Sequence, residues 1–326
     1  MTALRAPARA AALAGLALLV SCAGPPAAPA TGDRAWEATF QRAAQLLEEG
    51  RTGDAAEQYA AALQQVPAGD GHSEARLQAL EGLARARIMT GELGRAESLY
   101  VEVLAILADS LRAVEVPGER LVSTLGTLAD LNQSLGRPQR SEAYYRRILE
   151  LSEGGWVELG PTDLALAYTL AGMARLRRAR GDSTAADLLA GRAMGVNLLS
   201  QAHDLYIHDR LDEAEPLLRR ALALQERFLG PGHGDLAETC LLLGRLLEAT
   251  GHGDEALAQY RRAAAIGAEL AGRAGGIEAA ALEDLAALLR QQGTSDEADR
   301  AASRALQIRR GLRGGEGGRA EAPADL

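Results

Sequence analysis

The sequence predicts an all-α protein, a right-handed superhelical solenoid of about seven stacked antiparallel helix pairs. Two observations lead to this prediction. Hydrophobic residues make up 47% of the 326 residues and aromatic residues only 3%, so the core has to be built mainly from alanine and leucine, which favour closely packed helices. A turn residue also recurs seven times, with small residues at fixed distances on both sides of it, and such internal periodicity indicates a repeat architecture.

The first thirty residues have the layout of a secretory signal. Arg5 and Arg9 give it a positive start, residues 10–20 are apolar or small, and this apolar stretch is too short to span a bilayer. The four residues 19–22, LVSC, resemble the bacterial lipobox. The resemblance implies that Cys22 is diacylated and becomes the first residue after cleavage. The alternative is an ordinary signal peptide that happens to contain a cysteine.

This resemblance implies a lipoprotein signal peptide at residues 1–21 and a flexible tether at residues 22–33, which are rich in Pro, Ala and Gly. Lipid chains such as palmitate would hold the mature chain on a membrane surface. Ala23 stands where an aspartate would signal retention at the inner membrane. The resemblance therefore favours the outer membrane, facing the periplasm.

The repeat is centred on the turn residues that separate the two helices of each pair. These are Gly50, Gly91, Gly136, Gly181, Asp209, Gly251 and Gly293. The residue seven positions before the turn is always small: Ala43, Ala84, Ala129, Ala174, Ala202, Gly244 and Ala286. The residue five positions after it is small as well: Ala55, Ala96, Ser141, Ala186, Ala214, Ala256 and Ala298. Small residues let two helices approach closely, and a glycine ends a helix at little steric cost.

These spacings resemble the tetratricopeptide repeat over residues 34–310, and residues 211–266 are most similar to the longer repeats of kinesin light chains. The sequence departs from the pattern where Arg42 and Gln201 replace a leucine eight positions before the turn, and where Asp209 replaces a turn glycine.

Two irregular segments lie within and after the repeats. The spacing of 28 residues between Gly181 and Asp209 is too short for a full repeat, so we expect a truncated helix near Gly191–Gly195 and a bend near residues 191–197. Residues 311–326 are rich in glycine and poor in bulky apolar side chains, and they are predicted to form a disordered tail.

Composition limits the chemistry. All 35 basic residues are arginine, which excludes a Schiff-base lysine and the lysine of a phosphate-binding P-loop. A net charge of −9 with few aromatic residues argues against a nucleic-acid partner. His203 and His208 are five residues apart and would face different directions on a helix, so no metal or other cofactor is predicted.

Five further residues are expected in the core. Cys240 is predicted to be a small buried hydrophobe. Four tyrosines recur nine positions after the turn, where we expect them to pack between neighbouring repeats: Tyr59, Tyr100, Tyr145 and Tyr260.

The resemblance implies a concave groove lined by the first helix of each pair, at positions six and three before the turn. The candidate groove residues are Arg85, Asp130, Arg175, Arg178, His203, Arg245 and Arg290. The planar fork of arginine suits carboxylates, so such a groove is predicted to hold an acidic segment or a terminal carboxylate of a partner protein. The alternative is that these arginines pair with carboxylates on neighbouring helix faces.

The sequence therefore predicts a lipid-anchored, non-catalytic scaffold of the bacterial cell envelope that binds partner proteins or peptides. One alternative is a structural or self-assembling component of an envelope complex, which would form homo-oligomers if the terminal helix at residues 296–312 is covered by another subunit. An envelope hydrolase is the alternative that the sequence supports least, because no nucleophile-elbow motif marks a Ser–His–Asp arrangement.

Overall fold

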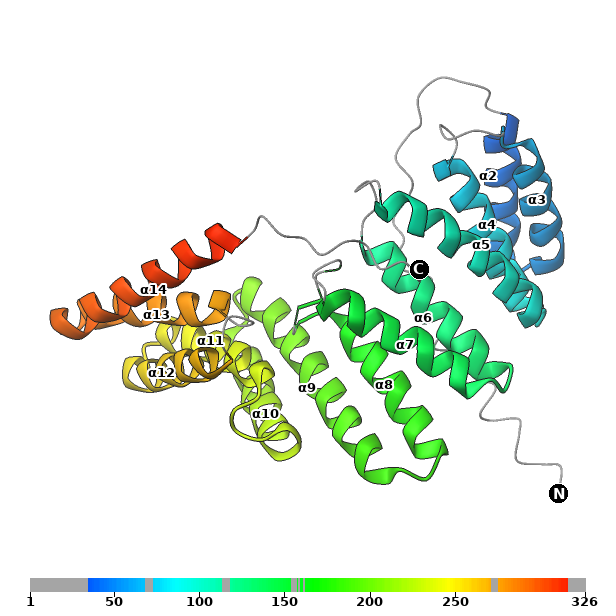
Figure 1. Cartoon of the computed structure of the whole chain (residues 1–326). Coiled ribbons are helices and arrows are strands. Elements are labelled where there is room, and N and C mark those ends of the chain that lie inside the picture. The colour runs from blue at the N-terminus through cyan, green and yellow to red at the C-terminus, as the bar shows by residue number, and fades with distance from the viewer. Residues whose placement is uncertain are drawn as a thin grey trace. The chain divides into compact units, whose positions relative to one another are not determined.

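The computed structural model of the chain describes residues 35–67, 73–112, 118–153, 157, 159–160, 162–270 and 275–315. These residues form 13 helices and no strand, so the predicted all-α repeat fold is confirmed (Figure 1). The predicted signal peptide and tether, Cys22 included, lie outside the described residues. The handedness of the superhelix stays a prediction.

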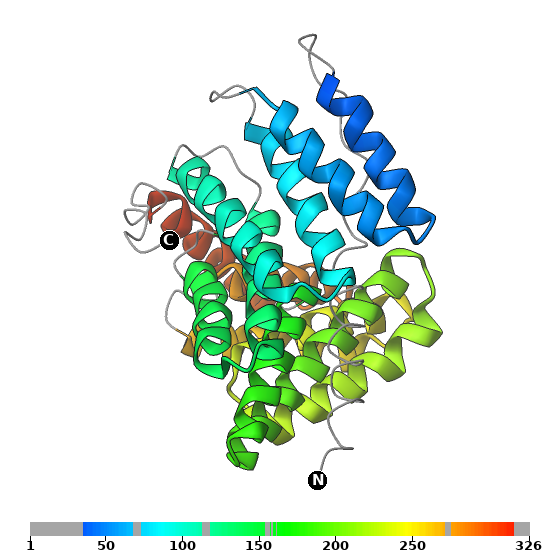
Figure 2. The same ribbon diagram turned by 90° about the vertical axis from the view of Figure 1, so that its right-hand side faces the viewer.

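The helices follow one another as antiparallel pairs, which can be followed from blue to red in Figures 1 and 2. The first and second helices of the seven pairs are α2 (Ala35–Glu48) with α3 (Thr52–Gln65), α4 (Ser73–Met89) with α5 (Leu93–Arg112), α6 (Gly118–Ser134) with α7 (Pro138–Glu153), α8 (Leu164–Ala179) with α9 (Ser183–Ile207), α9 with α10 (Leu211–Leu229), α11 (Gly234–Ala249) with α12 (Gly253–Glu269), and α13 (Gly275–Gln291) with α14 (Ser295–Gly315). Thirteen helices give seven pairs because α9 belongs to two of them.

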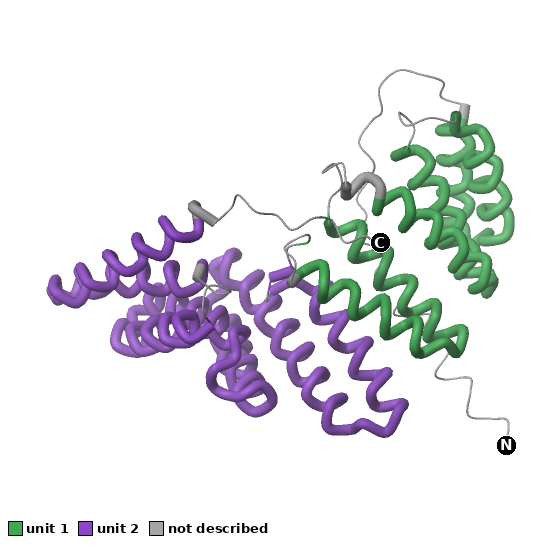
Figure 3. Tube along the Cα trace, in the orientation of Figure 1, with its two compact units in different colours: residues 1–157, 321–326 green, residues 158–320 purple. Residues whose placement is uncertain are grey.

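The chain divides into two compact units (Figure 3). Unit 1 comprises residues 1–157 and 321–326, and its described helices are α2 to α7. Unit 2 comprises residues 158–320 and contains α8 to α14.

Each predicted turn residue ends a first helix in the left-handed conformation. Gly50 has a φ of 76°, and the non-glycine Asp209 has a φ of 59°. At the Asp209 turn the amide of Arg210 donates to the carbonyl of Leu205 at 2.9 Å, which satisfies a carbonyl at the helix end. Aspartate tolerates this conformation better than most residues, so the pattern survives its substitution for glycine.

The predicted packing of the small residues and tyrosines is confirmed, with one difference for the tyrosines. Tyr59 lies on Gly82 of the next pair, where a Cβ atom would approach its ring to 2.4 Å. Tyr260 lies instead on Gly244 of its own pair, where a Cβ atom would approach to 2.6 Å. Both tyrosines are buried, and each fills the space that a glycine leaves open.

The prediction of a truncated helix between Gly191 and Gly195 is wrong, because α9 runs unbroken through both glycines. In Figure 1 it lies between α8 and α10. A Cβ atom on Gly191 would lie 2.2 Å from the ring of Phe228, and one on Gly195 would lie 3.0 Å from Gln225, both on α10. These glycines permit close approach of α10 and do not end the helix. The bend predicted near residues 191–197 stays a prediction.

The two departures at the leucine position now have a physical explanation. Leu83 and Leu128, eight positions before their turns, pack with buried residues of the preceding helix pair. Arg42 is on α2, the first helix that the structure describes. Gln201 is on α9, which is the second helix of one pair and also the first helix of the next, so no separate second helix packs on it from the preceding pair. Both side chains are exposed, because within the described residues no preceding second helix covers them.

The last helix is longer than expected. The tail was predicted to begin at residue 311, but α14 continues to Gly315. Leu312 is half-buried and Arg309 pairs with Glu283 of α13 at 3.1 Å, so α13 supports this end of α14. The rest of the predicted tail lies outside the described residues.

Candidate partner-binding surface on the first helices

The first helices of neighbouring pairs lie close together. Within unit 2, α11 contacts both α9 and α13, and within unit 1 α2 contacts α4. The second helices of unit 2 are joined by long side chains instead, as between Arg219 and Glu255 at 3.1 Å. We call the layer formed by α4 and α6 in unit 1, and by α9, α11 and α13 in unit 2, the first-helix surface of each unit.

Arg85 of α4 is a half-buried cation on the first-helix surface of unit 1. Its Nε atom is buried and has no hydrogen-bond partner, and no carboxylate pairs with the side chain within the described ranges. Its charge acts on the hydroxyls of Tyr59 and Tyr100. Burial raises the pKa of Tyr100 to about 12, and the positive charge of Arg85 opposes that shift. The guanidinium therefore lies near two tyrosines, whose hydroxyls are also affected by the charges of Glu48 and Glu81, but within the described residues it makes no ion pair with either carboxylate.

Asp130 and Arg120, two other ionisable groups of this surface in unit 1, have partners. Asp130 is buried, and the hydroxyl of Tyr145 donates to its carboxylate at 2.5 Å. Arg120 of α6 donates to Glu81 at 2.8 Å and to Glu74 at 2.7 Å, both on α4. These contacts join α4 to α6 and leave the anion-binding capacity of Arg85 unused.

The equivalent arginine of unit 2 is occupied. The Nε atom of Arg245 on α11 donates to Asp284 on α13 at 2.6 Å. Beside it, burial raises the pKa of Glu238, and the positive charge of Arg245 and the charged form of His203 oppose this shift. The structure therefore brings together two predicted residues, His203 and Arg245, with two acidic residues that the sequence analysis did not single out.

The three other arginines predicted to line the groove make contacts of other kinds. Arg178 pairs with Asp187 at 2.6 Å, and Arg290 pairs with Asp299 at 3.2 Å. Each of these pairs crosses a hairpin turn, so it joins the two helices of one repeat. The guanidinium of Arg175 is exposed and lies 5.9 Å from the centre of the Tyr168 ring, where a cation–π contact is favourable.

A signal for the missed acidic partners was present in the sequence. Ion pairs between neighbouring first helices join residues about one repeat apart, as in Arg245–Asp284 with 39 residues and Arg192–Asp235 with 43. Opposite charges one period apart were therefore the pattern to look for.

The remaining candidates behave as core residues or lie outside the described ranges. Cys240 is a free, fully buried thiol, as expected, and burial raises its pKa to about 11, so it stays protonated at neutral pH. No group of three His, Cys, Asp or Glu residues in the described part of the chain is arranged to hold a metal ion. None of the described helices combines the length and apolar character needed to cross a membrane.

Comparisons with known proteins agree with the repeat pattern. Models of the tetratricopeptide repeat family match residues 122–154 and 196–269. No curated protein matches the chain.

Among solved structures, the chain is similar to BtubC (BKLC) from P. vanneervenii, with 21% identity over 90% of this chain and 98% of that one and a TM-score of 0.32. It is similar to the kinesin light chain TPR-like repeats of Podospora anserina, with 21% identity over 74% and 99% and a TM-score of 0.38. It is also similar to the TPR2AB domain of yeast Sti1 in complex with pHSP90, with 13% identity over 85% and 100% and a TM-score of 0.28.

Tetratricopeptide repeats generally mediate protein–protein interactions, and proteins built from them are typically non-catalytic scaffolds. The matched segments cover α7 with most of α6, and the run from the second half of α9 to the end of α12. The chain thus contains tetratricopeptide repeats within an all-α repeat structure.

Proposed function

We propose that this chain is a non-catalytic scaffold that binds an acidic segment of a partner protein on the first-helix surface of unit 1. The observation that carries the proposal is the half-buried Arg85, whose Nε atom has no hydrogen-bond partner and whose side chain makes no ion pair within the described residues. Taking a charged group out of water without a partner is unfavourable, and a bound carboxylate would compensate for that cost. The planar fork of arginine can hold both oxygens of one carboxylate, whether it belongs to a side chain or to a chain end.

The surroundings of Arg85 suit a carboxylate ligand. Tyr59 and Tyr100 flank the guanidinium, and their pKa values are raised, so both keep their protons at neutral pH. A protonated phenol is a hydrogen-bond donor that can help to hold an anion beside the arginine.

A site-specific cross-link from the same helix tests the proposal. Met89 lies one turn after Arg85 on α4 and is 55% exposed, so a photo-reactive residue at position 89 samples this surface. In cells, we expect it to cross-link one protein through a peptide that contains Asp, Glu or the chain's end. Arg85→Ala is expected to lower the yield by about tenfold, which corresponds to the loss of one charge-assisted contact.

The matched control is Arg95→Ala on the second helix α5, whose side chain is 71% exposed and pairs with Glu92. This variant is expected to keep the full cross-link. Equal yields in the parent, Arg85→Ala and Arg95→Ala would contradict the proposal, and so would a cross-linked peptide without any carboxylate.

We further propose that the scaffold is held on a bacterial membrane by lipid on Cys22. The support is the position of Cys22 directly after an apolar segment of signal-peptide length. Radiolabelled palmitate is expected to label the chain in cells, and Cys22→Ala is expected to abolish the label and to move the chain out of the membrane fraction. A labelled Cys22→Ala chain would contradict the proposal. The outer membrane is expected to hold the labelled chain, which density separation of the two membranes tests.

A second candidate function is a structural component that makes its contacts through the end of the repeat array. It is favoured by Leu306 of α14, an apolar side chain that is 52% exposed at that end.

A further inference from the structure

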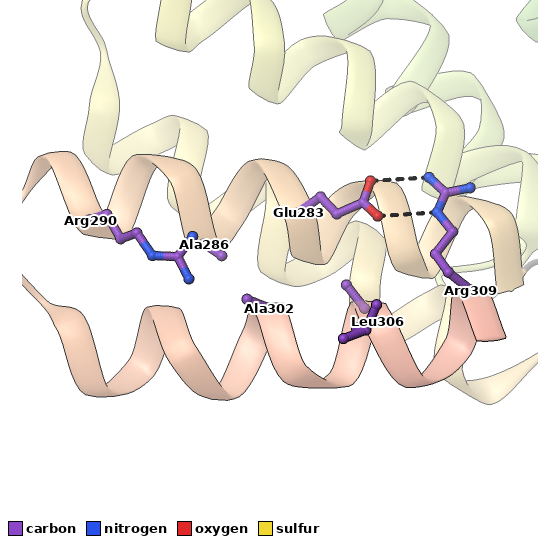
Figure 4. Close-up of a pocket in the computed structure, with 7 residues that line it drawn as sticks. Glu283, Ala286, Arg290, Ala302, Leu306 and Arg309 are labelled. Carbon is purple, nitrogen blue, oxygen red and sulfur yellow. Dashed lines mark hydrogen bonds and ion pairs between the residues drawn. The ribbon is translucent and has the colours of Figure 1, made fainter.

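The outer side of the last helix pair carries an unfilled groove of about 360 Å³ between α13 and α14 (Figure 4). Its lining residues are Glu283, Ala286, Arg290, Ala302, Ala305, Leu306 and Arg309. In Figure 4, Ala302 and Leu306 of α14 lie on the side that faces α13, and Arg309 reaches across to Glu283 at one end. The groove has an apolar floor of small residues and a charged residue pair at each end.

The preceding helix pair shows why this groove is open. The groove between α11 and α12 is covered by α13, and Tyr260 fills part of it, nine positions after its turn. In the last pair the residue at the same position is Ala302, and no other described residue fills that space. Arg309 stands where α12 has Gly267, so a further repeat would meet a charge where α12 and α13 make a close helix contact. The groove is therefore adapted to something other than another repeat of the same kind.

The charges around the groove are self-complementary. One end carries Arg290 with Asp299, whose side chain is 73% exposed. The other end carries Glu283 with Arg309, and Arg310 is exposed one residue further along α14. If the α14 helices of two copies of the chain lie antiparallel, Asp299 of each copy lies near Arg310 of the other. Such a patch fits an interface with two-fold symmetry, in which both copies use the same surface.

The apolar residues of α14 are also compatible with a two-fold interface. Suppose that two α14 helices pack antiparallel about a two-fold axis that passes between residues 304 and 305. Asp299 of each copy then faces Arg310 of the other copy, and Leu306 of each copy faces Ser303 of the other. Leu306 of each copy then also reaches the space above Ala302 in the other, which is the open part of the groove. We propose that a second copy of this chain occupies this groove, and that α14 packs antiparallel against α14 of that copy.

The first described helix offers no such match. Thr39, Arg42 and Gln45 of α2 stand at positions where the first helices α4, α6 and α13 carry leucine or alanine to pack on the preceding pair. Because this face is polar, stacking of one chain's last pair onto another chain's first pair is disfavoured. The symmetric α14 contact closes after two copies, whereas such end-to-end stacking would continue into a fibre.

Opposite single charge reversals test the proposal on the full chain with Cys22→Ala. The parent is expected to reach twice the mass of one chain as concentration rises, in light scattering after gel filtration. Asp299→Arg and Arg310→Asp are each expected to stay monomeric, because each places two like-charged pairs in the symmetric interface. When the two variants are mixed, every such pair again joins opposite charges, so the mixture is expected to recover the dimer.

The mixture separates loss of the interface from loss of folding, because an unfolded variant is not rescued by its counterpart. Arg300→Asp, on a different face of α14, is the control and is expected to dimerise like the parent. A parent chain that stays monomeric at all concentrations overturns the proposal, and leaves the groove to a helix of another protein or to residues 316–326. A dimer that survives either single reversal, or two monomeric variants whose mixture stays monomeric, overturns it as well.

Discussion

Arg85 in unit 1 and Arg245 in unit 2 occupy the same position of their repeats, six residues before the turn, but among the residues that the structure describes only Arg245 has an ion-pair partner. The following first helix decides the difference. Nine residues before its turn, α13 carries Asp284, which binds Arg245 at 2.6 Å, whereas α6 carries Thr127. Thr127 is buried and its hydroxyl donates to the carbonyl of Ser123 at 2.9 Å. We expect this one difference between the neighbouring repeats to decide whether the arginine has an internal ion pair.

The strongest test of this comparison moves the carboxylate into unit 1. Thr127→Asp is expected to supply Arg85 with an internal partner and to lower cross-linking from position 89 by about tenfold or more. The effect is expected to equal that of Arg85→Ala, although the arginine remains. Thr127→Asn, which has the same shape without the charge, should retain most of the cross-link. A Thr127→Asp chain that binds its partner fully would show that Arg85 does not hold a carboxylate.

The reciprocal change removes the carboxylate from unit 2. Asp284→Asn is expected to lower the free energy of unfolding by about 1–2 kcal/mol, less than for a fully buried pair, because the Arg245 side chain is 41% exposed and that of Asp284 is 28% exposed. Urea unfolding followed by circular dichroism measures this difference. A double-mutant cycle with Arg245→Gln isolates the pair energy, and a coupling close to zero would show that the contact does not contribute to stability.

Much of the fold was predictable because it depends on steric rules that act within a few residues. Small residues and turn glycines specify close helix contacts and left-handed turns, and even the substitution of Asp209 preserves the turn. The shared helix α9 was not predictable from the same signals. Gly191 has the appearance of a helix breaker in the sequence, and only the ring of Phe228 against it shows that it serves packing.

The sequence predicts where the candidate surface lies, but not which of its arginines form ion pairs. The sequence places Arg85, Arg178 and Arg245 on first helices, but an ion pair depends on which carboxylate the fold brings near. The partner of Arg178 is nine residues away across a turn, whereas that of Arg245 is one repeat away. The unpaired state of Arg85 follows from the absence of such a carboxylate within the described residues, which requires the positions of all its neighbours.

The tyrosines beside the two arginines give a smaller contrast. The hydroxyl of Tyr260 donates to Glu248 at 2.7 Å, so Tyr260→Phe is expected to cost about 1 kcal/mol of unfolding free energy. Tyr100 lies beside Arg85, where no hydrogen bond of its hydroxyl is found within the described residues, so Tyr100→Phe is expected to change stability by less than about 0.5 kcal/mol. Urea unfolding of both variants measures the difference, and equal losses would contradict the comparison.

The smallest expected effect is a pH dependence from Glu238 on α11 that α4 of unit 1 does not show at the same position. Glu238 stands thirteen residues before its turn, and the equivalent residue of α4 in unit 1 is Gln78, which does not titrate. Burial raises the pKa of Glu238 above its ordinary value of 4.5. Between pH 4.5 and the folded pKa, the folded chain therefore binds a proton that the unfolded chain has lost. The stability contributed by this group is therefore present below pH 4.5 and is lost as the pH rises through the folded pKa.

The charges that face Glu238 limit the size of this effect. Arg245 and the protonated form of His203 both favour the carboxylate, so they reduce the stability that is lost between pH 4.5 and 7. Glu238→Gln is expected to remove this component, so the urea midpoint of the variant should fall less over that pH range than that of the parent. Gln78→Glu in unit 1 tests the comparison directly. If burial at this position of the repeat causes the shift, this variant acquires the same pH dependence. If it does not, the shift depends on the local burial of Glu238 on α11 and not on the position in the repeat.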